Sequence, residues 1–192
     1  TGSRRRQFLA GKVWENVVCE EIRGNVDTRL RKLQEGSYDG IILAKAGLDR
    51  LGTESDREGM FDFYPLSPEL FLPAACQGIL AVEAVEGSAA AGICKEISDA
   101  QTALCYVVER EALAQMSADC SETAAAWCRI VKEEERRKRD SAQTPYAADR
   151  LVLDVMYADR RVRVTGLVSE TEGRRLARYA ARQVKSGVPC GR

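Results

Sequence analysis

Apolar and polar residues in the first third of the chain alternate between two kinds of spacing. Residues 17–22 and 40–44 are short runs rich in valine, isoleucine and leucine. This length and composition are typical of buried strands. Between them, apolar residues recur at helical spacing from Val26 until Gly36. Residues 1–66 are therefore expected to form part of an α/β domain, in which each strand leads into a helix.

The next segment, residues 67–97, is expected to connect two domains. Prolines punctuate its entry, residues 79–82 are expected to form a strand, and residues 89–97 are expected to form a helix. The pattern then changes at Ser98, which with Gln101 makes a capping box. The helix that follows carries one apolar face, made by Leu104, Val108, Ala112 and Met116.

The last part of the chain predicts a β-hairpin and a final helix. Residues 151–157 and 161–168 alternate apolar and polar positions around a short turn at 158–160. Ser169 and Glu172 are expected to cap the last helix, which Gly187 ends. Its inward positions are Leu176, Ala180 and Val184. Residues 98–192 are thus expected to be a small α+β domain with an antiparallel sheet and helices.

A charged insertion, residues 131–150, separates these elements. Three acidic residues each precede a basic residue by four positions, which favours an exposed helix or a mobile loop over a binding role.

Composition excludes several function classes. The 192 residues include 29 basic and 29 acidic side chains, so no nucleic-acid partner is indicated. The absence of histidine excludes Ser-His and Cys-His catalytic pairs and His-containing metal sites, and no metal is expected. Seven cysteines without C-x-x-C spacing favour a reduced, cytoplasmic protein. No apolar run reaches membrane-spanning length.

Spaced arginines are the strongest functional signal in the sequence. Arg23 is expected at the start of a helix, Arg29 lies one turn into it, and Arg50 follows the second predicted strand. A helix start offers free N–H groups and positive charge, and an arginine beside it adds a fork of donors. This combination of residues is well suited to binding carboxylates.

Three segments of the chain resemble the porphobilinogen deaminase (hydroxymethylbilane synthase) family. The first segment, T-G-S-R-R-R-Q-F-L at residues 1–9, is similar to the family's T-S-S-L-R-R-Q-x-x-L. Residues 72–83 resemble L-P-A-x-G-Q-G-x-x-x-x-E, with Cys76 at a family glycine. The residues from Thr102 through Glu109 and Arg110 to Cys120 follow T-A-x-x-x-x-x-E-R…C, with Ala118 and Asp119 where the family has two glycines.

The resemblance implies a transferase of porphyrin and heme biosynthesis. Members join four porphobilinogen molecules into hydroxymethylbilane on a dipyrromethane cofactor, which here would be attached through a thioether to Cys120. Gln77 and Gly78 would line the cleft near this cofactor. The carboxylates of the cofactor, porphobilinogen and the growing oligopyrrole would be held by Ser3, Arg5, Arg6, Arg23, Arg29 and Arg50.

The family also has an N-terminal half-domain that carries a catalytic aspartate, and no segment here matches it. The resemblance therefore implies an incomplete domain of the periplasmic-binding-protein type for residues 1–66, with the missing half-domain as a partner and a monomer when complete. The alternative is a non-catalytic module that binds pyrrole carboxylates or other anions. The changed residues before Cys120 favour this alternative, whereas the matched arginines favour the enzyme.

Overall fold

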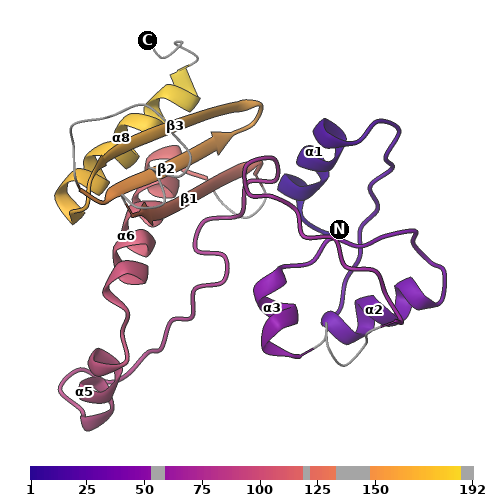
Figure 1. Ribbon diagram of the computed structural model, residues 1–192, viewed down its shortest axis with the longest axis horizontal. Helices are drawn as coiled ribbons and strands as arrows, with labels where there is room; N and C mark the ends of the chain where they lie inside the picture. The colour runs from indigo at the N-terminus through magenta and orange to yellow at the C-terminus, as the bar shows by residue number, and fades with distance from the viewer. Residues whose placement is uncertain (53–58, 119–121, 133–147, 187–192) are drawn as a thin grey trace. The chain divides into compact units, whose positions relative to one another are not determined.

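The computed structural model describes residues 1–52, 59–118, 122–132 and 148–186, which group into two compact units (Figure 1). Of the described residues, the first unit holds 1–73 and 122–123, and the second holds 74–118 and 124–186. The division after residue 73 falls inside the segment that the sequence predicted as a connection. The described residues mix helix and strand.

Among the residues described, the first unit contains the helices α1 (Arg4–Val13), α2 (Val26–Gln34) and α3 (Lys45–Arg50). Ser3 begins α1 and Asn25 begins α2, each by accepting a hydrogen bond from a backbone N–H of the first turn. The helix predicted between Val26 and Gly36 is thereby confirmed. The buried apolar residues of this unit are Leu9, Ala10, Ile22, Leu30, Phe71 and Leu72.

The strands predicted over residues 17–22, 40–44 and 79–82 are wrong for this structure, because all three segments lack regular secondary structure. A strand exists only where its backbone pairs with a neighbouring strand. Within the described residues, the only strand pairs are those of the second unit, so these apolar segments have no ladder partner. Val18, Leu80 and Val82 are accordingly exposed.

The second unit packs two helices on one face of a three-stranded antiparallel sheet (Figure 1). Its elements are α5 (Ala89–Glu96), α6 (Ala100–Met116), β1 (Ala124–Val131), β2 (Arg150–Tyr157), β3 (Arg160–Leu167) and α8 (Glu170–Ser186). The strand order is β1-β2-β3, so β2 is central and β1 is an edge. The predicted hairpin is confirmed, since Tyr157 pairs with Arg160 across its turn.

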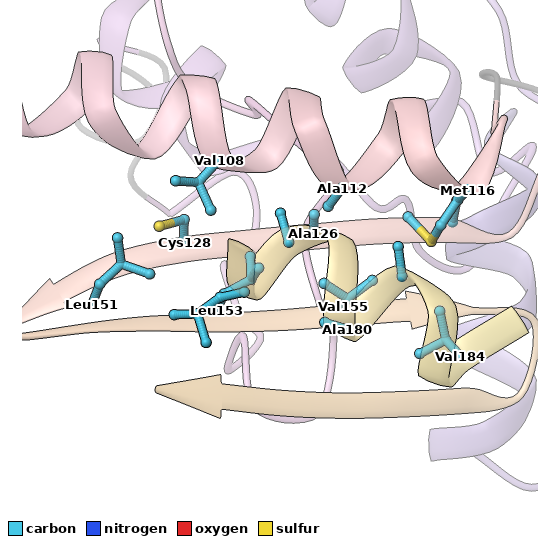
Figure 2. Packing of buried hydrophobic residues seen from close by; sticks show 14 residues of the cluster. Val108, Ala112, Met116, Ala126, Cys128, Leu151, Leu153, Val155, Ala180 and Val184 are labelled. Atoms are coloured by element: carbon cyan, nitrogen blue, oxygen red, sulfur yellow. The ribbon is translucent and has the colours of Figure 1, made fainter. Parts of the chain in front are cut away.

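The core of this unit lies between the sheet, α6 and α8. Figure 2 shows Val108 of α6 next to Cys128 of β1, and Met116 toward the other end of the same helix; all three belong to one buried cluster with Val155 of β2. The inward positions predicted for α8 are buried as well, at Leu176, Ala180 and Val184. The small α+β arrangement expected for the last part of the chain is therefore confirmed.

Two predicted details of this unit differ or lie outside the described residues. Helix α6 is capped by Asp99, whose Oδ1 accepts the N–H of Thr102 at 2.7 Å, and not by Ser98. Aspartate caps a helix at least as well as serine, so the helix begins after Asp99, one residue later than predicted. Gly187, Cys120 and residues 133–147 of the charged insertion lie outside the described residues.

Candidate carboxylate-binding site

The start of α2 depends on a glycine that directly follows Arg23. Gly24 has a φ of +119°, and a Cβ at this position would lie 2.7 Å from Cγ2 of Thr28. Only glycine accepts both this φ and this approach. Asn25 follows and accepts the N–H of Thr28 at 2.9 Å, so Arg23, Gly24 and Asn25 together fix how the chain enters the helix.

Arg29 and Arg6 come from different helices and lie near each other in the first unit. The Nε of Arg29 donates to the carbonyl of Gly24 at 2.8 Å, and the Nη1 of Arg6 donates to the carbonyl of Ile42 at 2.9 Å. Burial lowers the pKa of Arg6, and the positive charge of Arg29 lowers it further. Two cations held this close favour an anion between or beside them.

Ser3 supports this pair from the start of α1. Its hydroxyl oxygen accepts the backbone N–H of Arg6 at 3.4 Å, which fixes the first turn of the helix. The sequence placed Ser3 among the residues that hold carboxylates. In the structure its side chain orders the backbone of Arg6, which is the residue that lies near Arg29.

Arg23 lies at the surface beside an acidic neighbour. Its Nη2 is 2.7 Å from Oε1 of Glu21, and its side chain is 84% exposed. An ion pair this exposed contributes little to stability, so an incoming carboxylate can exchange with Glu21 at small cost.

Arg5 lies in the interior of the first unit. Its side chain is only 5% exposed and donates to the backbone carbonyl of Leu72. Burial, and after it the charge of Arg6, lowers the pKa of Arg5 to about 10. In this structure Arg5 ties α1 to the segment that precedes the second unit.

The other predicted site residues lie in different places. Arg50 is exposed at the end of α3, next to residues outside the described part. Gln77 and Gly78 belong to the second unit, in a turn where the N–H of Gln77 donates to the carbonyl of Ala74 at 3.1 Å. Cys120 lies outside the described residues. The structure thus brings together Arg6 and Arg29, with Ser3 ordering the backbone of Arg6.

The turn at Gln77 has a feature that the sequence analysis missed. The carboxylate of Glu109, in α6, accepts the backbone N–H of Cys76 and also that of Cys128. In the sequence, Glu109 stands out only as part of the T-A-x-x-x-x-x-E-R motif. The signal that could have singled it out is its place between apolar positions, because Val108 and Ala112 are core residues of the same helix.

Within the described ranges, no group of three or more Cys, Asp or Glu side chains is arranged to hold a metal ion. None of the helices described is long and apolar enough to cross a bilayer.

Comparison with known proteins gives one consistent family. Residues 1–92 match the family model described as porphobilinogen deaminase, dipyromethane cofactor binding domain. A probable porphobilinogen deaminase of Methanosarcina mazei is 32% identical over 201 residues, which cover 98% of this chain and 60% of the relative. The porphobilinogen deaminase of Paenibacillus macerans is 36% identical, covering 89% of this chain and 49% of that protein.

A third relative, the porphobilinogen deaminase of Streptococcus sanguinis, is 42% identical over 128 residues, which cover 66% of this chain and 41% of the relative. The chain thus spans between 41% and 60% of the length of these three proteins.

Proposed function

Because the chain belongs to the porphobilinogen deaminase family, we propose that it forms the arginine-bearing part of a hydroxymethylbilane synthase. This transferase joins four porphobilinogen molecules head to tail and releases ammonia at each joining. The observation that carries the proposal is the pair Arg6 and Arg29, each anchored to a backbone carbonyl and near enough for the charge of Arg29 to lower the pKa of Arg6. Porphobilinogen carries two carboxylates on each ring, which suits such a pair.

The residues of the first unit fit a dipyrromethane cofactor. The cofactor carries carboxylates, and Arg6 with Arg29 offers guanidinium groups whose other contacts, to the carbonyls of Ile42 and Gly24, hold them in place. Arg23 and Arg50 are exposed, and their guanidinium groups would donate further hydrogen bonds to the carboxylates. When bound, the cofactor supplies the pyrrole to which the incoming units are joined. Cys120 would carry the cofactor, with Gln77 and Gly78 beside it.

These arginines would act by binding and orienting the carboxylate side groups. Their charge is permanent near neutral pH, and burial of Arg6 removes water that would otherwise weaken the interaction. Each hydrogen bond to a charged group contributes roughly 1.5–3 kcal/mol. Arg5 would act indirectly, by holding Leu72 and with it the segment that leads to Gln77.

The non-catalytic alternative has its own supporting observations. Arg5 donates to a backbone carbonyl inside the first unit, and Arg23 is paired with Glu21. Fewer guanidinium groups are then directed at a ligand than the sequence suggested. A module that binds one pyrrole carboxylate, or another small anion, needs only Arg6 and Arg29.

We further propose that residues 1–66 belong to a domain of the periplasmic-binding-protein type, that 67–97 connects domains, and that 98–192 is the C-terminal domain. The support is the match over residues 1–92 and the exposed apolar side chains of Val17, Val18, Leu80 and Val82, which suit pairing of these segments with further strands.

The test is the intact mass of the full-length protein, followed by peptide mapping around Cys120. We expect a mass increment of two linked pyrrole units on the peptide that contains Cys120. Cys120→Ala is expected to remove the increment, whereas Cys94→Ala, on α5, is expected to retain it. An unmodified Cys120 in folded protein would contradict the synthase and favour the anion-binding module.

A further inference from the structure

Glu109 is a buried carboxylate in the middle of an apolar helix face. Only 4% of the residue is exposed, and its neighbours Val108 and Ala112 are fully buried. Placing a charge there is costly unless hydrogen bonds compensate for the lost water. A leucine or methionine would fill such a position without this cost, so the carboxylate must serve the groups that it contacts.

Those groups are two backbone amides from segments far apart in sequence. One oxygen, Oε1, accepts the N–H of Cys128 at 2.7 Å, and the other, Oε2, accepts the N–H of Cys76. Cys128 lies in β1, an edge strand, so one side of its backbone has no neighbouring strand in the described sheet. Glu109 occupies that side and at the same time holds the turn that contains Cys76.

The turn held in this way is strained. Cys76 has a φ of +59°, a left-handed conformation that costs a non-glycine residue roughly 1–2 kcal/mol. Two backbone hydrogen bonds close the turn, from Gln77 to Ala74 and from Ile79 to Cys76, each of 3.1 Å. Strain of this kind persists only where surrounding contacts enforce it, and it is common at functional sites.

We propose that Glu109 is a positioning residue, whose carboxylate clamps the turn at residues 74–78 to the edge of β1 and so fixes where Gln77 and Gly78 lie. The proposal deepens the proposed function, on which it rests, because these two residues are the ones expected beside the cofactor. Glu109 itself touches the backbone and acts through the turn.

The clamp depends on the ionisation of Glu109. An ionised carboxylate offers both oxygens as acceptors, whereas a protonated one places a hydrogen on one of them and weakens its contact with a backbone N–H. Burial raises the pKa of Glu109 to about 7, against the lowering effect of its two amide partners and of the Cys76 thiol. The clamp therefore loosens as the pH falls below neutrality.

The other titratable groups that face Glu109 are thiols. They belong to Cys76 in the turn, Cys105 in α6 and Cys128 in β1. Burial raises the pKa of the Cys76 thiol to about 11, so this group stays neutral around pH 7. The positive charge of nearby Arg110 partly opposes this rise in the pKa of Cys76. The hydrogen bond with Cys128 lowers the pKa of the Cys105 thiol, so the Glu109→Gln variant is needed to assign a titration near neutral pH to the carboxylate.

The first test follows backbone amides of the wild-type full-length protein by NMR between pH 5 and 9. We expect the amide protons of Cys76 and Cys128 to shift together with one midpoint near pH 7. Glu109→Gln is expected to abolish this shared titration. The matched control is Glu111→Gln, which removes the same charge from the same helix but contacts Arg174 and Arg178 of α8. Separate midpoints for the two amides would overturn the proposal.

The second test is amide hydrogen exchange in the same variants. In Glu109→Gln we expect at least tenfold faster exchange at Gln77 and Ile79, while Leu153 and Val155 of the central strand change by less than twofold. Equal acceleration at all four amides would mean that Glu109 serves only overall stability. Unchanged exchange at the turn would likewise overturn the clamp.

The third measurement links the clamp to the site, by calorimetric titration with porphobilinogen. We expect Glu109→Gln to bind at least fivefold more weakly than wild type, and Glu111→Gln to bind equally well. Equal binding by wild type and Glu109→Gln would overturn the positioning role. If wild type does not bind porphobilinogen, the proposed function fails, and the exchange and titration results still decide whether Glu109 holds the turn.

Discussion

The guanidinium groups of Arg6 and Arg29 lie close enough for the charge of Arg29 to lower the pKa of Arg6, although the two residues belong to different helices. Each is anchored by a backbone carbonyl, of Ile42 for Arg6 and of Gly24 for Arg29. Their mutual repulsion is a cost in the free protein, and a carboxylate bound to both would relieve it.

Removing either arginine is therefore expected to weaken ligand binding. Arg6→Leu or Arg29→Leu should lose roughly 1.5–3 kcal/mol of binding free energy for porphobilinogen, which is about a tenfold to 150-fold rise in Kd. Arg31→Leu is the matched control, because Arg31 lies in the same helix and pairs with Glu35 at the surface. Calorimetric titration measures all three, and unchanged affinity in Arg29→Leu would remove that residue from the site.

Arg5 is expected to respond differently, because its side chain lies inside the first unit. Arg5→Met keeps much of the side-chain volume but leaves the carbonyl of Leu72 without this donor. We expect the free energy of unfolding to fall by about 1–3 kcal/mol, as measured by urea denaturation. Arg29→Leu, at a less buried position, should change it by under about 0.5 kcal/mol. A stable Arg5→Met protein that has lost ligand binding would instead place Arg5 in the site.

The raised pKa of Glu109 predicts how stability depends on pH. Because the folded protein binds this proton more tightly than the unfolded chain, the stabilisation of the fold by protonation is fully present below pH 4.5 and is lost as the pH rises to about 7. Protonation removes the cost of a buried charge, which is larger than the loss from the weakened amide contacts. A shift of this size corresponds to a loss on the order of 3 kcal/mol. Glu109→Gln should flatten this part of the profile in urea denaturation at pH 5 and pH 8. If the free energy of unfolding depends on pH equally in wild type and Glu109→Gln, the pKa of Glu109 is not raised in the folded protein.

The second unit could be predicted from the sequence because its signals are local. The spacing of Val108, Ala112 and Met116 gives α6 its buried face, and the alternation in 151–157 and 161–168 gives the hairpin. Strand β1 was missed, since the small residues Ala124, Ala125 and Ala126 at its start have weak strand preference. Their burial comes from tertiary packing, which the pattern of this segment itself does not reveal.

The first unit was harder to predict because strands need partners. The apolar runs at 17–22 and 40–44 carry the composition of strands, but nothing local says whether a neighbouring strand is present. The candidate site is likewise predictable only where its features are local. The start of α2, with Arg29 one turn in, could be predicted from Gly24 and Asn25, whereas the burial of Arg5 and the double contact of Glu109 depend on tertiary packing.

The outer face of the sheet holds a second buried carboxylate, on Asp154. Only 1% of this residue is exposed, and it accepts hydrogen bonds from Arg129 at 2.8 Å and from Arg161 and Arg163 at 3.0 Å. Burial raises its pKa, but the bonds from the three arginines outweigh burial and leave the pKa lowered. Its stabilisation is therefore present above its ordinary pKa and is lost as the pH falls below it.

Replacing this carboxylate is expected to be severely destabilising. In Asp154→Asn the three arginines keep their charges but lose the anion between them, which should cost about 3–5 kcal/mol in urea denaturation. The matched control is Asp159→Asn, at the exposed hairpin turn of the same sheet. Equal stability of the two variants would show that the arginines do not depend on Asp154.

The entry to α2 gives a last prediction, which separates backbone strain from steric contact. Gly24 and Gly36 both have positive φ, so an alanine at either position costs about 1 kcal/mol. A Cβ at Gly24 would also lie 2.7 Å from Thr28, whereas one at Gly36 meets nothing within 4 Å. Gly24→Ala must therefore shift the loop whose carbonyl anchors Arg29. We expect Gly24→Ala to bind porphobilinogen about tenfold more weakly than Gly36→Ala in calorimetric titration, and equal affinities would mean that this loop does not position Arg29.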